Sequence, residues 1–247
     1  MSLFDRFNLG AGFSKYFQIE AGAKESVRDE VFRVRHEVYC EELKFEPERP
    51  DRRETDAFDP QSVHCLLRSA RAPNQPVGCT RLILAREDAP DTPLPFEQAC
   101  EATLDRSIID PARLDRRTIG EVSRLAVRAA YRRRRGERNV AVAIADDDFS
   151  ENESQPRFPY IPIALYLGAL ALAERNGIET MFVLTEPRLA AHFGKLGVEI
   201  KQIGAPVEHR GMRVPSMMNV PAIIKNMRFM VKPIWRVVRD EIEGSYR

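Results

Sequence analysis

The sequence is poor in cysteine and histidine and has no long apolar run. Its four cysteines lack the close pairs of a zinc site and the density of a disulfide scaffold, and its four histidines show no metal-ligand spacing. The longest apolar stretch, residues 161–173, is too short to cross a bilayer, and the first residues lack a basic segment followed by an apolar core. These absences predict a cytoplasmic protein with reduced thiols and without a metal site, a signal peptide or a transmembrane helix.

The chain also has almost no net charge. Its formal charge of +1 excludes a protein that binds nucleic acid through an overall positive field. Positive charge is concentrated in an arginine run at residues 132–135, but aromatic residues are not interleaved with it as in single-strand binders. We therefore expect no nucleic-acid partner, and the run is either a local contact surface or a solvated face.

Hydrophobic patterning predicts one α/β domain, residues 1–220, followed by a helical extension at 221–247. The predicted strands are 16–20, 62–70, 76–84, 118–127, 180–184, 198–203 and 212–220, and the predicted helices are 24–43, 162–176 and 186–196. Two irregular segments, near 85–117 and 129–159, are predicted to be insertions in the domain.

The extension has an apolar face and a basic polar side at helical spacing. We expect it to dock on the domain or on a partner subunit, with peripheral contact to a membrane surface as the alternative. Pro233 should kink or divide this helix, because proline cannot complete the helical hydrogen-bond ladder.

The predicted strand at 118–127 contains polar residues where a central strand should be apolar. Glu121, Ser123 and Arg124 place a carboxylate, a hydroxyl and a guanidinium there. A functional site accounts for this conflict. A buried glutamate that stabilises the sheet by pairing with Arg124 or Arg81 accounts for it as well.

Four further charged residues are candidates for the same site. Arg35 adjoins the apolar edge of the helix at 24–43, in position to point into a cleft, although a surface arginine fits the pattern too. Asp56 and Asp59 lie three residues apart in a polar loop, where they can support arginines or form a solvated turn. Arg81 lies on a predicted strand and could join their charge network.

Four blocks of the sequence resemble acyl-homoserine-lactone autoinducer synthases, in the same order. The segment VFRVRHEVY at 31–39, with Phe45 beyond it, resembles their first helix and following turn, and ETDAFD at 54–59 resembles their acidic loop. The segments GCTRL at 78–82 and EVSR at 121–124 resemble their third and fourth strands. The chain is also similar to N-acyl amino acid synthases, and most of all to the acyltransferases associated with PEP-CTERM/exosortase systems. This resemblance, like the order of the elements, implies a GNAT-like three-layer α-β-α sandwich around a mixed, splayed sheet.

The resemblance also implies a reaction in which an amine attacks a thioester. Glu121 would be the base that takes a proton from the amine, with Ser123 and Arg124 as further catalytic residues. Substrate-binding roles fall on Arg35, Tyr39, Phe45, Asp56, Asp59 and Arg81. Strict alternation would put Arg124 on the other face of the strand from Glu121 and Ser123, so a shared cleft requires a β-bulge, which would splay the sheet and admit the thioester arm.

Two aromatic positions depart from the family pattern, which has Phe and Trp where this chain has Tyr39 and Phe45. Both keep an aromatic wall. Tyr39 adds a hydroxyl and Phe45 lacks the indole N–H donor, and both changes affect which acceptor and which acyl chain the site prefers.

The segment YRRRRG at 131–136 resembles the phosphate-binding turn of coenzyme-A-dependent GNAT enzymes, but no second glycine follows at the usual spacing. This favours a donor presented on acyl carrier protein, whose acidic surface would meet Arg132, Arg133, Arg134 and Arg135. We therefore predict an N-acyltransferase that moves a fatty acyl group from the phosphopantetheine thioester of acyl carrier protein to the amine of an amino acid or related small metabolite, without a tightly bound cofactor. The alternatives are an acyl-CoA-dependent GNAT acyltransferase and a non-catalytic module that binds acyl carrier protein or lipid.

Overall fold

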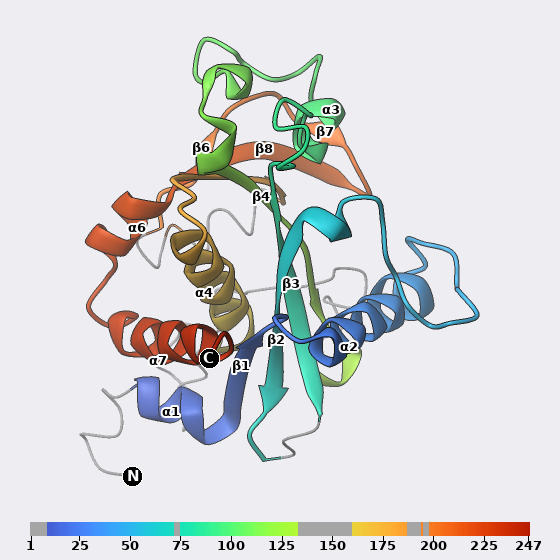
Figure 1. Cartoon of the computed structure of the whole chain (residues 1–247), viewed down its shortest axis with the longest axis vertical. Coiled ribbons are helices and arrows are strands. Elements are labelled where there is room, and N and C mark those ends of the chain that lie inside the picture. The colour runs from blue at the N-terminus through green and yellow to red at the C-terminus, as the bar shows by residue number, and fades with distance from the viewer. Residues whose placement is uncertain (1–8, 72–74, 133–159, 187–193, 195–197) are drawn as a thin grey trace.

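The computed structural model describes residues 9–71, 75–132, 160–186, 194 and 198–247 (Figure 1). Its strands are β1 (Phe17–Ala21), β2 (Ser62–Ser69), β3 (Pro76–Leu84), β4 (Ile119–Val127), β5 (Thr180–Thr185), β6 (Lys201–Gln202), β7 (Val207–Glu208) and β8 (Met212–Asn219). Its longer helices are α1 (Leu9–Tyr16), α2 (Glu25–Arg35), α4 (Tyr160–Arg175), α6 (Val220–Asn226) and α7 (Lys232–Gly244).

The strands form one mixed sheet in the order β1-β2-β3-β4-β5-β8-β6, with β7 paired to β8. All neighbours are antiparallel except β4 and β5, which are parallel and are connected through α4. A parallel pair needs such a crossover, since a tight turn cannot return the chain to the same edge. The predicted strands are confirmed in this sheet, although the one expected at 198–203 is reduced to β6.

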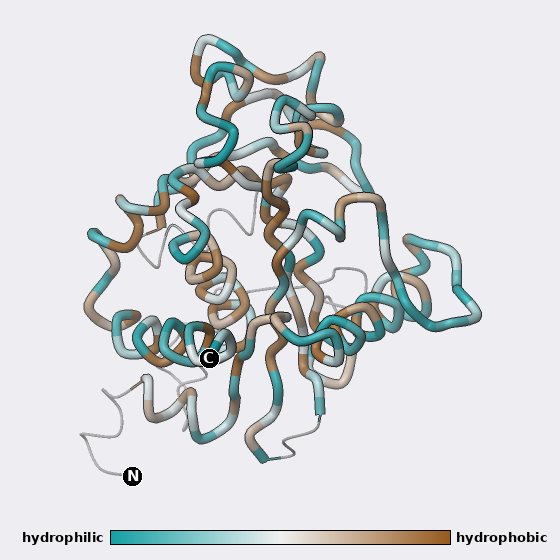
Figure 2. Tube along the Cα trace, in the orientation of Figure 1, coloured by the Kyte–Doolittle hydropathy of each residue, from teal (hydrophilic) through white to brown (hydrophobic). Residues whose placement is uncertain are grey.

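Helices cover both faces of the sheet, so the molecule has three layers (Figure 1). Neighbouring residues of β2 show the division. Leu66 packs with α2 in one apolar cluster, whereas Cys65 and Leu67 pack with α4 in another, because successive side chains of a strand point to opposite faces. Helix α4 is buried through residues 162–173 and is apolar along most of its length (Figure 2). The predicted α-β-α sandwich is therefore confirmed.

The long helix expected at 24–43 changes its winding partway. It is α-helical over Glu25–Arg35 and continues as a wider π-helical segment, His36–Glu42. The wide turn leaves the carbonyl of Tyr39 to accept hydrogen bonds from the N–H groups of Phe45 and Glu46, at 2.8 and 3.2 Å. Such turns are frequent at functional sites, and this one sets the positions of the aromatic residues described below.

The C-terminal extension docks on the domain, as expected. It is divided into α6 and α7, and Pro233 lies in the first turn of α7, where its missing N–H costs no hydrogen bond. The apolar face of α7, Ile234, Trp235, Val238 and Ile242, is buried in the cluster around α4. Its polar side also covers the edge of the sheet, because the N–H groups of Ile19 and Ala21 in β1 donate to Glu241 and Ser245, at 2.8 and 2.9 Å.

The irregular segment at 85–117 packs against the end of the sheet near β5. It contains a short helix, α3 (Pro95–Ala99), whose Phe96 stacks on Phe182 of β5 with ring centroids 4.4 Å apart. Arg116 ties the segment together by bonding Glu97 at 2.7 Å. Most of the other predicted insertion, and of the helix expected at 186–196, lies outside the described residues. In the described part of the chain, no helix combines the length and the apolar character needed to cross a membrane.

Candidate active site

The sheet opens at the middle of β4. On one side β4 pairs with β5 only from Ile119 to Val122. On the other side Ser123 is opposite Arg81 and Ala126 is opposite Cys79, so that Arg124 and Leu125 face the single residue between them. Arg124 has a φ of 51°, in the left-handed region that residues other than glycine rarely adopt. The predicted β-bulge and splayed sheet are both confirmed.

A cavity of about 520 Å³ lies at this opening. Both diverging strands line it, through residues 121–125 of β4 and 183–185 of β5. Further parts of its wall come from the segment around the π-helical turn, the loop at 54–58, the β7–β8 hairpin, β3, the segment of α3 and α4. The cavity is large enough for a small-molecule substrate.

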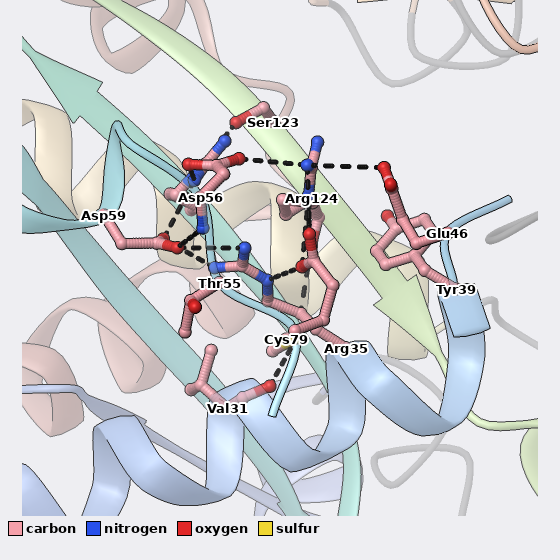
Figure 3. A network of polar contacts seen from close by, with 12 residues as sticks. Val31, Arg35, Tyr39, Glu46, Thr55, Asp56, Asp59, Cys79, Ser123 and Arg124 are labelled. Atoms are coloured by element: carbon pink, nitrogen blue, oxygen red, sulfur yellow. Dashed lines mark hydrogen bonds and ion pairs between the residues drawn. The ribbon is translucent and has the colours of Figure 1, made fainter. Parts of the chain in front are cut away.

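Beside the cavity, three arginines and three carboxylates form one network (Figure 3), made of Arg35, Arg81, Arg124, Glu54, Asp56 and Asp59. Arg35 binds Glu54 and Asp59 at 2.5 and 2.6 Å, and Arg81 binds Asp56 and Asp59 at 2.6 and 2.8 Å. Arg124 closes the ring through Glu54 and Asp56, at 3.1 and 2.9 Å. Each charge is thus shared between two partners of the opposite sign.

The network fixes its carboxylates in the ionised form. Burial alone would disfavour the charge of Asp59, but the hydrogen bonds and positive charge of Arg35, with the charge of Arg81, outweigh it and lower the pKa of Asp59 far below its usual value. The pKa values of Glu54 and Asp56 are lowered in the same way. These groups therefore carry fixed negative charge at neutral pH.

Glu121 has a different environment. It is 4% exposed, and its carboxylate accepts a hydrogen bond from the N–H of Phe96, at 2.8 Å, at the start of α3. None of the ion pairs among the described residues includes Glu121, so the alternative of a glutamate paired with Arg81 or Arg124 is wrong. Burial raises the pKa of Glu121 to about 7, against the opposing effects of the Phe96 hydrogen bond and the nearby arginines.

Ser123 lies between these two environments. Its hydroxyl accepts a hydrogen bond from Nε of Arg81 at 3.0 Å. It lines the cavity together with Glu121 and Arg124, so the three polar residues of the strand do meet at one cleft.

The aromatic wall expected from Tyr39 and Phe45 is also present, since both line the cavity. The added hydroxyl of Tyr39 donates to the carbonyl of Leu125 at 3.0 Å, within the bulge. The guanidinium of Arg124 lies over the Tyr39 ring, 5.7 Å from its centroid. Tyr39 therefore braces the bulged part of β4.

Two predicted substrate-binding residues are placed behind the cavity wall. Arg35 is fully buried, and its guanidinium is occupied by Glu54 and Asp59. Neither Arg35 nor Asp59 lines the cavity, whereas Asp56 and Arg81 do. This geometry does not leave the Arg35 guanidinium free to contact a substrate directly. Its contacts are those of a positioning residue.

The predicted carrier-protein surface is corrected at one residue. The side chain of Arg132 is 5% exposed and bonds to Glu42 at the end of the π-helical segment. It is turned inward because that carboxylate lies within reach. Arg133, Arg134 and Arg135 lie outside the described residues.

Several site residues were not predicted. Glu54 lies in the segment that resembles the acidic loop, and its carboxylate joins Arg35 to Arg124. Arg49 lines the cavity, and the hydrogen bonds of its guanidinium among the described residues go only to Thr55, at 3.0 and 2.9 Å. The β7–β8 hairpin brings His209, Arg210 and Arg213 to the cavity from the far end of the sequence, and Arg210 bonds to Glu46 across it. No local pattern signals these hairpin residues, because only the fold brings them close.

Among residues 9–71, 75–132, 160–186, 194 and 198–247, no three His, Cys, Asp or Glu side chains converge as a metal site.

Comparisons with known proteins agree with this architecture. Residues 34–141 match the family model for the acetyltransferase (GNAT) domain. The CoA-dependent acyl-homoserine lactone synthase BjaI, solved with SAM and isopentyl-CoA, is 19% identical, with a TM-score of 0.56, and the alignment covers 92% of this chain and 90% of BjaI. MesI, also a CoA-dependent acyl-homoserine lactone synthase, is 19% identical, with a TM-score of 0.57. That alignment covers 88% of this chain and 95% of MesI.

TofI, solved in a ternary complex with an inhibitor and MTA, is 18% identical with a TM-score of 0.56, and the alignment covers 82% of this chain and 91% of TofI. No sequence among curated proteins matches the chain. At these identities the solved structures establish the fold alone, and the nearer resemblance to PEP-CTERM/exosortase-associated acyltransferases stays a prediction. The match of residues 34–141 to a GNAT domain, together with the shared fold, supports an acyltransferase.

Proposed function

We propose that this acyltransferase transfers a fatty acyl group from an acyl-carrier-protein thioester to the amine of an amino acid or a related metabolite. The observation that carries the proposal is Glu121, a buried carboxylate with a pKa raised to about 7, on the wall of a cavity at the opening of the sheet. A general base works best when its pKa is near the working pH, and Glu121 meets that condition.

The proposed reaction requires two proton transfers. Glu121 takes one proton from the acceptor's ammonium group, directly or through water, and later releases it to solvent. The freed amine attacks the thioester carbonyl carbon, and the C–N bond forms as the C–S bond breaks. The departing thiolate takes the second proton from the former amine, so the products are an amide and a free thiol.

The bulge supplies the means to stabilise the negative charge on the thioester oxygen. Arg124 and Leu125 are outside the regular pairing with β3. We infer that backbone N–H groups at this irregularity bind the thioester oxygen. Arg124 adds positive charge at the same place, held by Glu54 and Asp56. Arg35 and Asp59 position these groups from behind the wall, and Arg81, on the wall itself, binds Asp56 and Asp59.

An amino acid acceptor fits the charges on the cavity wall. Asp56 is held ionised and lines the cavity, so it can attract the ammonium group. Arg49 is the candidate for binding the acceptor's carboxylate, since it lines the cavity and its guanidinium has no carboxylate partner among the described residues. A bidentate contact from Arg49 to the acceptor's carboxylate would then select amino acids over simple amines.

The proposal also names the acyl donor, which is a thioester of acyl carrier protein. The sequence lacks the complete pyrophosphate-binding turn, which favours a carrier-protein thioester. BjaI and MesI are CoA-dependent, so acyl-CoA is the second candidate. We further propose residues 1–220 as the catalytic domain and 221–247 as an extension that completes its core, acting in the cytoplasm where acyl carrier protein is loaded.

The test is a product search with both donors. Purified protein is incubated with carrier-protein thioesters of mixed chain length, or with the matching acyl-CoAs, together with a pool of amino acids and S-adenosylmethionine. Mass spectrometry should detect a new N-acyl product, formed faster from the carrier protein and lost in Glu121→Gln. Donor binding without any product would favour the binding module. Equal or faster use of acyl-CoA would overturn the carrier-protein donor.

A further inference from the structure

The turn between α6 and α7 exposes the most accessible apolar side chains of the described structure. Phe229 is 85% exposed and the adjacent Met230 is 64% exposed, more than any other large apolar residue in the described ranges. The turn lies at the outer edge of the molecule, beside α6 (Figure 1). Adjacent bulky apolar side chains at the surface are a mark of an interaction site, because exposing them to water is unfavourable.

The turn is held in place from both ends. Met227 and Val231, which flank it, are 6% and 5% exposed and are anchored in the main apolar cluster. Within the turn, the N–H groups of Val231 and Lys232 donate to the carbonyl of Arg228, at 2.9 and 3.3 Å. The exposed pair is therefore presented by a fixed turn with buried neighbours on both sides.

Four cations flank this pair in the sequence, between residues 225 and 236. Lys225, Arg228, Lys232 and Arg236 are exposed, and none of them has an ion-pair partner among the described residues. The sequence contains no Asp or Glu between Glu208 and Asp240. By contrast, Arg239, one turn further along α7, is paired with Glu174.

We propose that the α6–α7 turn, residues 225–236, binds the surface of an anionic phospholipid bilayer, with Phe229 and Met230 inserted among the lipids and the four cations at the phosphate level. Two apolar side chains give far less area than the roughly 800 Å² per partner of a protein interface. A shallow apolar insertion combined with positive charge is instead what a bilayer surface requires. The inference does not depend on the acyl-transfer reaction.

This refines the expectation from the sequence. The amphipathic helix itself does not lie on a membrane, because the apolar face of α7 is buried in the domain. The turn before it remains available, and it orients the domain with α6 and the start of α7 toward the lipid.

The experiment is vesicle flotation with the full chain and no substrate. Vesicles of phosphatidylcholine alone are compared with vesicles in which about 30% is phosphatidylglycerol, at low and at 0.5 M salt. Binding should require the anionic lipid and weaken in salt. Phe229→Ser/Met230→Ser should reduce binding about tenfold or more, and Arg228→Gln/Lys232→Gln should do the same at low salt, since each cation near the surface contributes about fivefold.

Matched controls remove the same chemistry elsewhere. Ile108→Ser replaces another exposed apolar residue. Arg113→Gln/Arg117→Gln lowers the positive charge by the same two units at exposed arginines that are paired with Asp110 and Asp115, so both variants should bind like the unaltered protein. Phe229→Trp should show a blue-shifted emission that brominated lipids quench.

No binding to anionic vesicles, or binding that the turn variants leave unchanged, would overturn the proposal. Light scattering that shows a dimer lost in Phe229→Ser/Met230→Ser would assign the turn to a second copy instead.

Discussion

Two groups of carboxylates at the same cleft have opposite environments. Glu54, Asp56 and Asp59 are buried with three arginines, which lower their pKa values despite burial. Glu121 is buried with one backbone N–H, and its pKa rises to about 7. The difference shows that burial alone does not set the charge of a carboxylate. The partner groups decide whether it becomes a fixed anion or a group that exchanges a proton at neutral pH.

The largest expected effect is on the stability of the network of three arginines and three carboxylates. Glu54→Gln removes a partner from both Arg35 and Arg124 and leaves buried positive charge uncompensated, so the free energy of unfolding should fall by about 3–5 kcal/mol. Urea denaturation at pH 7 measures it. Glu48→Gln, which removes an exposed glutamate paired with Lys44, is the matched control and should change stability by less than about 1 kcal/mol. An equal loss in both variants would contradict the network's role.

The next effect is on turnover. Glu121→Gln should lower kcat about a hundredfold or more, because the amide cannot take the proton of the acceptor. The kcat of the unaltered protein should rise with pH and level off above about 7, as Glu121 loses its own proton.

Rate–pH profiles of the two proteins test this assignment. In Glu121→Gln, kcat should no longer rise with pH up to about 7. In Ser123→Ala, kcat should be lower but should keep this rising limb. A limb that persists in Glu121→Gln would assign the base to another group.

At alkaline pH Glu121→Gln should raise the stability of the fold, whereas Glu54→Gln should lower it. A raised pKa means that the folded protein favours protonated Glu121, so its ionisation destabilises the fold as the pH rises from about 4.5 through 7. Glu121→Gln should therefore be more stable than the unaltered protein at pH 8, by up to about 3 kcal/mol, and lose that advantage near pH 4.5. Thermal denaturation across this pH range measures the difference. Lower stability at pH 8 would contradict a desolvated Glu121.

The smallest expected effect concerns acceptor choice. Arg49→Gln should raise KM for the amino acid acceptor about tenfold, because a charge-assisted contact is lost, and should leave KM for the donor unchanged. The matching amino acid amide, which lacks the carboxylate, should react equally well with both proteins. Steady-state kinetics with the two acceptors decide between this role and a structural one, for which both acceptors would be affected alike.

Much of the site could be predicted because its residues conflict with their local pattern. Glu121, Ser123 and Arg124 stand out in an apolar strand, and the incompatibility of their faces required the bulge that the structure contains. Glu54 escaped prediction because an acid in a polar loop is ordinary, and only its burial between Arg35 and Arg124 gives it a role. Arg49 and the β7–β8 hairpin residues were not predicted either, because they are ordinary polar residues in the sequence and only the fold brings them to the cavity.

Local patterns in the sequence predicted most of the strands and helices in order, but not α1, α3 or β7, and they predicted the polar residues of β4 and a break in the C-terminal extension. Propensity and periodicity are local properties, so they are legible before folding. The tertiary structure alone decided which charges meet. It turned Arg35 inward to Asp59 and Glu54, left Glu121 without an ion pair in the described network and brought Arg210 to Glu46. Pairing and desolvation depend on distance in space, and a linear sequence does not specify that distance until the sheet forms.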